Sequence, residues 1–303
     1  MEQSIRFARS ADGTTIAYAV SGEGPPLVKA ANWLTHLEYD RDSPVWRHWL
    51  AGLSRDHTLV RYDERGCGLS DREVDDLSFE AWVDDLESVV DALGLERFSL
   101  FGMSQGGPVG LAYAARHPER VGRMVLYGSY ATGWQHRGTP AHRRREEALM
   151  QLMSDGWGRD NPAFREVFTQ MFLPDGTREQ MDWFNELQRR TTAPHIAVRL
   201  EEEFGRIDVR EILDRVRCPI LVLHARHDEV IPFDAGRRLA AALPDARFVA
   251  LESRNHVLLE TEPAWERFLA EVRDFLGAAD VGDARGATAG HAGDAVDRPD
   301  GPA

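Results

Sequence analysis

The chain has 303 residues, of which 43% are hydrophobic, and a formal net charge of −14 at pH 7. This length allows one large domain or two small ones, and the hydrophobic content is sufficient for a folded core. The acidic balance disfavours a nucleic-acid-binding protein, because contacts to phosphate depend on lysine and arginine.

The remaining composition excludes several other classes. No apolar run approaches the roughly 20 residues of a membrane span, and the charged N-terminus lacks the apolar region of a signal peptide. Cys67 and Cys218 stand in no metal-binding spacing, which predicts reduced thiols and no metal. Of the 36 lysine and arginine residues only Lys29 is a lysine, and the arginines form no patch. We therefore expect a cytoplasmic protein without nucleic-acid, membrane or metal partners and without a cofactor; a homodimer is compatible with the sequence.

Short apolar runs alternate with amphipathic stretches in the first half of the chain. The turn at Asp12-Gly13 separates two such runs, which predicts an antiparallel hairpin over residues 5–9 and 14–20. Large apolar residues recur at helical spacing from Leu77 to Leu93 and predict a helix. Further elements are predicted as strands at 27–30, 58–62, 98–101 and 124–127 and a helix at 105–117. This order indicates a mostly parallel, twisted sheet flanked by helices.

The alternation stops between residues 131 and 216, where the pattern is helical and rich in large apolar side chains such as Trp134 and Trp157. Strands return at 220–224 and 248–251, and a last helix is predicted over 262–276. We therefore predict an α/β core of residues 1–130 and 217–276, with a helical cap of residues 131–216. Residues 277–303 are mainly Gly, Ala and Asp, which predicts a disordered tail.

The segment Gly102-Met103-Ser104-Gln105-Gly106 fits the G-x-S-x-G pattern of a nucleophile elbow, between a predicted strand and a predicted helix. A serine hydroxyl is a weak nucleophile and needs a histidine base oriented by a carboxylate. Asp228 and His256 follow the predicted strands at 220–224 and 248–251, in the chain order serine, acid, histidine. We predict Ser104 as nucleophile, Asp228 as acid and His256 as base.

Nearby residues are weaker candidates for these roles. His224 lies within an apolar strand and reads as a packed core histidine, His227 as a loop residue, and Glu229 is expected to point away from the site. Some hydrolases take their acid from the strand that precedes the insertion. Here that position is Gly128-Ser129-Tyr130, which holds no carboxylate, so Asp228 has no rival there.

With these motifs the chain resembles the α/β-hydrolase superfamily over nearly all of residues 1–276. Two further stretches carry the same resemblance. Residues 61–70 look like the D-x-R-G-x-G-x-S loop of the superfamily, and residues 115–121 follow the elbow helix as they do there. Residues 30–40 and 183–190 resemble a bacterial subgroup whose members occur alone or fused to helix-turn-helix or cyclase domains, and we expect no fused domain here. The resemblance implies the α/β-hydrolase fold and an oxyanion hole formed by the backbone N–H groups of Trp33 and Gln105.

One stretch departs from the family pattern, which usually has His-Gly where this chain has Ala31-Asn32 before Trp33. Asn tolerates positive φ, so Asn32 could replace the glycine, or it could aim its amide at the oxyanion or substrate; a plain turn residue is the third alternative. We predict a pocket from Asn32, Trp33, Met103, Trp134 and Trp157, although Met103 could pack under the elbow and the cap aromatics could form the cap's own core.

The leading functional hypothesis is hydrolysis of a carboxylic ester or lactone with an apolar acyl or ring group through an acyl-enzyme. Thioesters, amides and C–C bonds of diketones remain open as substrates, and so does perhydrolysis. The alternatives are a ligand-sensing protein with little turnover and an accessory enzyme of natural-product assembly. A complete triad favours the hydrolase.

Overall fold

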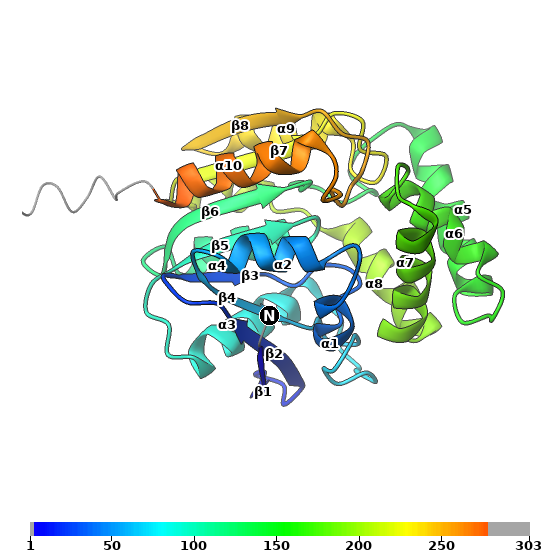
Figure 1. Cartoon of the computed structure of the whole chain (residues 1–303), viewed down its shortest axis with the longest axis horizontal. Coiled ribbons are helices and arrows are strands. Elements are labelled where there is room, and N and C mark those ends of the chain that lie inside the picture. Colours follow the sequence, from blue (N-terminus) through cyan, green and yellow to red (C-terminus); the bar gives the residue numbers. More distant parts are fainter. Residues whose placement is uncertain (1–2, 278–303) are drawn as a thin grey trace, which may run out of the picture.

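The computed structural model describes residues 3–277 and has an eight-stranded sheet at its centre (Figure 1). The strand order is β1-β2-β4-β3-β5-β6-β7-β8, where β2 runs antiparallel to β1 and β4 and the other neighbours are parallel. The strands are β1 Ser4–Arg9, β2 Thr15–Ser21, β3 Pro26–Lys29, β4 Thr58–Tyr62, β5 Phe98–Met103, β6 Val121–Tyr127, β7 Ile220–Ala225 and β8 Ala246–Leu251. The predicted fold class is confirmed. The tail was predicted from residue 277, but Gly277 is the last residue of α10, and residues 278–303 lie outside the described residues.

Helices cover both faces of the sheet. The Trp49 ring of α2 lies 4.8 Å from Trp265 and 4.9 Å from Phe268 of α10, so these two helices share one face. Helices α3 and α4 pack against each other, with α4 against β5, on the opposite face (Figure 1). The helices outside the 131–206 segment are α1 Leu37–Arg41, α2 Arg47–Ser54, α3 Phe79–Ala92, α4 Gly106–Arg116, α9 Phe233–Ala242 and α10 Pro263–Gly277, with a 3-10 helix at Arg210–Arg215.

Four helices lie between β6 and β7 in the chain and gather at the carboxyl end of the parallel strands (Figure 1). They are α5 Pro140–Gly156, α6 Ala163–Phe172, α7 Arg178–Thr191 and α8 Pro194–Arg206. Thr177 and Gln180 form a capping box that begins α7 and satisfies two of its free N–H groups. The helical character predicted for this segment is observed, while its division from the core as a domain at 131 and 216 stays a prediction.

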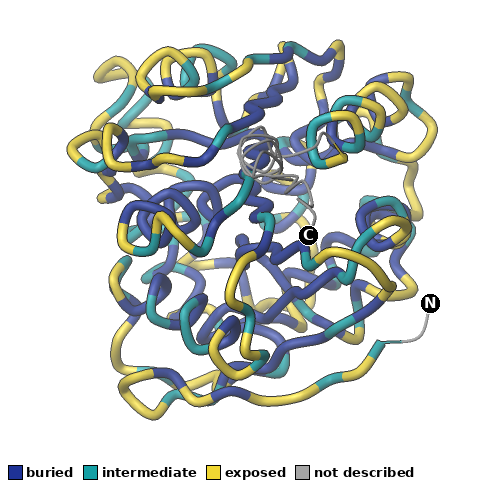
Figure 2. Tube along the Cα trace, turned by 90° about the vertical axis from the view of Figure 1, so that its left-hand side faces the viewer, coloured by how far each residue is buried: buried dark blue, intermediate teal, exposed yellow. Residues whose placement is uncertain are grey.

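Burial is concentrated in the sheet and in the inner faces of the helices (Figure 2). β7 is buried along its whole length, as expected for a strand covered on both faces, whereas β1 at the sheet edge is mostly exposed. No helix among residues 3–277 is long and apolar enough to cross a membrane. The architecture therefore presents the carboxyl ends of β3, β5, β7 and β8 to the four-helix segment, and this is where the predicted site residues lie.

Candidate active site

Ser104 occupies the sharp turn between β5 and α4, with a φ of 51°. Positive φ is unfavourable for a residue with a side chain and is typical of strained functional turns. The neighbouring glycines make the turn sterically feasible, since a Cβ on Gly102 would lie 2.7 Å from Gly107 Cα and one on Gly106 would lie 2.6 Å from the Ala31 carbonyl oxygen. Ser104 is only 8% exposed and lines a pocket together with residues of α5, α6 and α8.

Asp228 and His256 form a buried pair. The Nδ1 atom of His256 lies 2.7 Å from Asp228 Oδ2, while Asp228 Oδ1 accepts hydrogen bonds from the N–H groups of Val230 and Ile231, both at 2.9 Å. Burial by itself raises the pKa of Asp228, but the charge and hydrogen bond of His256 outweigh it and the net pKa lies below its usual value. Asp228 is therefore an ionised acceptor that orients the imidazole.

The serine and the pair border the same stretch of backbone. The N–H of Ser104 donates to the Tyr127 carbonyl at 3.0 Å, and a Cβ on the next residue, Gly128, would lie 3.0 Å from His256 Cε1. Phe172 lines the Ser104 pocket and also packs edge-on against the His256 ring at 5.2 Å. The Nε2 atom of His256 is buried and has no hydrogen-bond partner among the described residues, the Ser104 hydroxyl included.

The weaker candidates lie where they were expected. His227 and Glu229 are exposed, whereas His224 is fully buried and its Nε2 lies 2.8 Å from the Ile231 carbonyl. His224 Nε2 is also 3.8 Å from Asp228 Oδ2, so this core histidine packs behind the acid. Ser129, at the end of the strand that precedes the insertion, donates its hydroxyl to the Ser104 carbonyl at 2.9 Å and supports the elbow.

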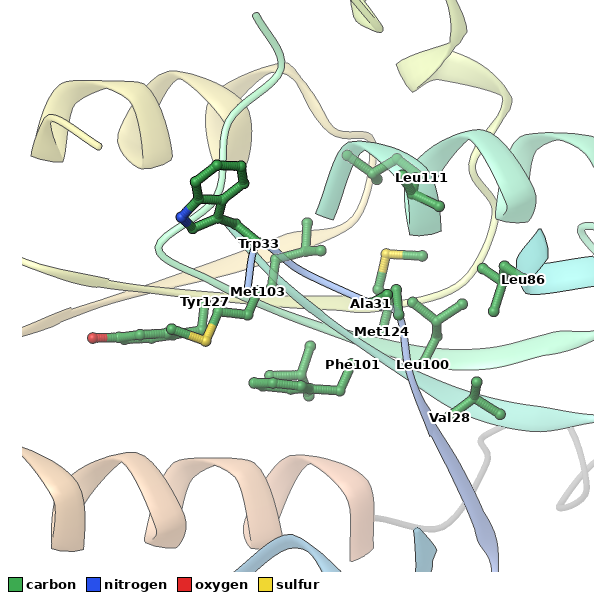
Figure 3. Packing of buried hydrophobic residues seen from close by; sticks show 14 of the residues in the cluster. Val28, Ala31, Trp33, Leu86, Leu100, Phe101, Met103, Leu111, Met124 and Tyr127 are labelled. Carbon is green, nitrogen blue, oxygen red and sulfur yellow. The ribbon is translucent and has the colours of Figure 1, made fainter. Parts of the chain in front are cut away.

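The pocket at Ser104 has a volume of about 60 Å³. Of the five pocket residues predicted, Trp33 and Trp134 line it. The structure places the other three elsewhere: Met103 is packed in the core (Figure 3), Trp157 lies behind Trp33 with its ring 5.5 Å away, and Asn32 faces a second cavity. Met103 and Trp157 are each 1% exposed, which matches the alternatives that Met103 packs under the elbow and that aromatic residues of the 131–216 segment form a core of their own.

The loop after β3 also corrects the expectation for Asn32. The left-handed φ falls on Leu34, at 63°, and not on Asn32. The Asn32 amide points neither at the oxyanion nor at the pocket, because it is held between Lys29 Nζ and the Trp33 carbonyl. The N–H groups of Trp33 and Gln105, the two predicted oxyanion donors, make no hydrogen bond to any described residue.

Sequence reasoning missed the polar end of the pocket. Arg137, Glu146 and Glu201 line it together with apolar residues of the cap helices. The guanidinium of Arg137 lies 4.4 Å from the centre of the Tyr130 ring, and burial raises the pKa of Glu201 to about 8. The sequence does not single out Glu201, because a glutamate on an amphipathic helix usually faces water.

Glu64 belongs to the same buried region and supports Gln105. Its Oε1 accepts a hydrogen bond from Gln105 Nε2 at 3.3 Å, while Oε2 is buried without a partner. Burial raises the pKa of Glu64 to about 8, although the Gln105 hydrogen bond acts in the opposite direction. The acid is therefore held neutral at pH 7.

We expect Glu64→Gln to stabilise the protein more at pH 8.5 than at pH 5.5. A raised folded-state pKa contributes stability that is fully present below the unfolded value near 4.5, and this contribution is lost progressively between about pH 4.5 and pH 8, by at most about 1.4 kcal/mol per pH unit. Glutamine keeps the acceptor for Gln105 and cannot ionise. Urea unfolding of variant and wild type at both pH values measures the difference, with Glu23→Gln at an exposed position as control. A difference that does not grow with pH would contradict the assignment.

Comparison with known proteins agrees with this fold. A family model described as the alpha/beta hydrolase fold matches residues 37–175. The chain is also 30% identical to a 2-hydroxymuconate semialdehyde hydrolase of Pseudomonas putida over 239 residues, which covers 75% of this chain and 80% of the relative. The chain therefore belongs to the α/β-hydrolase family.

Individual relatives differ in the activity that they are named for. A protein of Caulobacter sp. (strain K31) named "Putative carbamate hydrolase RutD" is 30% identical over 243 residues, or 76% of this chain and 85% of that protein. Among solved structures, the esterase RhEst1 from Rhodococcus sp. ECU1013 superimposes with a TM-score of 0.74 at 27% identity, covering 91% of this chain and 99% of the esterase. These relatives are all named as hydrolases, and they do not agree on the bond that is cleaved.

Proposed function

We propose that this protein is a serine hydrolase that cleaves a carboxylic ester or lactone through an acyl-enzyme on Ser104. The observation that carries the proposal is the Asp228–His256 pair, 2.7 Å apart and buried beside an elbow serine, with His256 Nε2 left without a partner. Asp228 holds Nδ1, so Nε2 is the ring nitrogen that is able to accept a proton from Ser104.

In the proposed reaction, Ser104 Oγ attacks the substrate carbonyl while His256 Nε2 takes the hydroxyl proton. The tetrahedral oxyanion is stabilised by the N–H groups of Trp33 and Gln105, which have no protein acceptor. His256 then donates its proton to the leaving alcohol, and water cleaves the acyl-enzyme by the same sequence. Asp228 stays ionised throughout and stabilises the imidazolium, consistent with its lowered pKa.

A fluorophosphonate probe tests the nucleophile directly, because it reacts with an activated serine and leaves a stable adduct. We expect labelling of the folded wild type at one site, Ser104, and none after heat denaturation. A folded wild type that remains unlabelled would refute the proposal and favour a binding protein. A panel of esters, lactones, thioesters, carbamates and C–C substrates then shows which type of bond is cleaved.

We expect a preference for medium-length or aromatic acyl groups over acetate. The pocket wall includes Met150, Met153, Phe168, Phe172 and Phe204, and each methylene buried against such a surface is worth about 0.8 kcal/mol, or about fourfold in kcat/KM. The measurement compares 4-nitrophenyl acetate, butyrate, hexanoate and phenylacetate. Met150→Trp, which fills the pocket, should remove the preference while sparing acetate. Equal turnover of acetate and hexanoate by the wild type would contradict an apolar acyl pocket.

A further inference from the structure

A buried polar cluster lies beneath the loop that follows β3. Lys29, Asn32, Asp40 and Arg61 line one cavity there, and each is at most 7% exposed. Lys29 is the only lysine in a chain that otherwise uses arginine for every basic side chain other than histidine. A lysine ends in a compact ammonium group, whereas arginine carries a wide planar fork, so the two are not interchangeable in a confined cavity.

Lys29 and Asn32 form a hydrogen-bond chain that ends on the backbone of Trp33. The Lys29 Nζ atom donates to Asn32 Oδ1, and Asn32 Nδ2 donates to the Trp33 carbonyl at 3.0 Å. Both ends of the Asn32 amide are therefore engaged away from water, where hydrogen bonds are stronger. The Trp33 carbonyl belongs to the peptide that follows Trp33, whereas the Trp33 N–H belongs to the peptide that precedes it. The bond from the Asn32 side chain therefore restrains the φ and ψ angles of Trp33 that join the two planes, and through them the direction of the N–H.

The loop needs such support because its next residue is strained. Leu34 has a φ of 63°, a conformation that costs a residue with a side chain about 1–2 kcal/mol. Thr191 donates its hydroxyl to the Thr35 carbonyl, and Thr35 Oγ1 accepts from the Glu64 N–H at 3.1 Å. These contacts hold the loop after Leu34, and the bonds of Lys29 and Asn32 hold it before Leu34.

We propose that Lys29 and Asn32 are positioning residues that aim the Trp33 N–H at the oxyanion, in place of the family's usual His-Gly. The inference rests on the proposed function of Ser104. The inference explains how the oxyanion loop of this chain can work with Ala31-Asn32 at the position where the family usually has His-Gly. Neither side chain touches substrate, since both face the cavity behind the loop.

The charge state of Lys29 is not required for this role. Burial lowers the pKa of Lys29 to about 8, against the raising effect of Asp40, Asp63 and Glu64, while Arg61 lowers it further. A neutral amine still donates a hydrogen bond to Asn32. The positioning therefore persists on both sides of pH 8, and the test is made by substitution at a fixed pH of 7.

The test uses Asn32→Ala and Asn32→Asp, with Leu50→Ala as matched control. Aspartate keeps the acceptor for Lys29 but loses the donor to the Trp33 carbonyl, whereas Leu50 lines the same cavity and removes only apolar contacts. We expect both Asn32 variants to lower kcat and the rate of fluorophosphonate labelling by 10- to 100-fold, with KM within threefold of the wild type. Leu50→Ala should lower the Tm and keep kcat within threefold.

A kcat that stays within threefold in both Asn32 variants, or one that falls equally in Leu50→Ala, would overturn the inference. Crystal structures of the Asn32 variants supply a second readout that does not depend on activity. We expect the Trp33 N–H to turn away from its present direction in these variants. A Trp33 N–H that keeps its direction would disprove the role of Asn32. If the wild type is neither labelled nor active, the proposed function fails, and the position of Trp33 in the variants still decides whether Asn32 holds the loop.

Discussion

Ser104→Ala is expected to lower kcat on an ester substrate by about 10⁵- to 10⁶-fold and to abolish fluorophosphonate labelling. The acyl-enzyme cannot form without the hydroxyl, and the triad acts as a unit, so loss of the nucleophile costs nearly all of its contribution. No hydrogen bond from the Ser104 hydroxyl to a described residue is lost, and alanine keeps the same strained turn at φ 51°. The free energy of unfolding should therefore change by less than about 1 kcal/mol.

The appropriate control for this variant is Ser129→Ala. Its hydroxyl lies next to the elbow and donates to the Ser104 carbonyl at 2.9 Å, so its removal perturbs the turn but not the nucleophile. We expect a loss of stability and less than a 100-fold fall in kcat. Single-turnover kinetics with 4-nitrophenyl esters distinguish the two. Retention of more than about 1% of wild-type activity by Ser104→Ala would exclude it as the nucleophile.

Asp228→Asn is expected to lower kcat by about 10⁴-fold while leaving the fold intact. The new amide oxygen can still accept from Val230 and Ile231, but the amide nitrogen donates to His256 Nδ1, where the carboxylate accepted at 2.7 Å. The imidazole is then held in the tautomer that carries its proton on Nε2 and cannot act as a base toward Ser104.

Two neighbouring substitutions show whether this effect is specific. Glu229→Gln changes an exposed carboxylate adjacent to the acid and should leave kcat within about twofold. Asp228→Ala should lose activity and stability together, because it leaves the Val230 and Ile231 N–H groups without an acceptor. The measurement is kcat with the unfolding free energy of each variant. If Asp228→Asn retained a tenth of wild-type activity, another acceptor would have to orient His256.

The sequence pattern did not predict the shortest helices of the fold, because a short helix contains few apolar residues at helical spacing. Helices α1 and α2 were not predicted, and neither was α9, in which only Gly236 and Leu239 are buried. A short helix with a narrow apolar face produces little periodicity. The strands, by contrast, were predicted close to their observed positions, apart from the first three residues of β6, since strands such as β5 and β7 are mostly apolar and buried.

The sequence by itself determined the α/β class, the elbow around Ser104 and the chain order that singles out Asp228 and His256. These follow from backbone sterics, apolar periodicity and the meeting of strand ends at one edge of a parallel sheet, all of which are local or topological. Only the tertiary structure decided that Asn32 turns away from the pocket toward Lys29 and that Phe172 of the cap packs on His256. A side chain's direction depends on which distant segments pack around it, and no spacing along the chain records that.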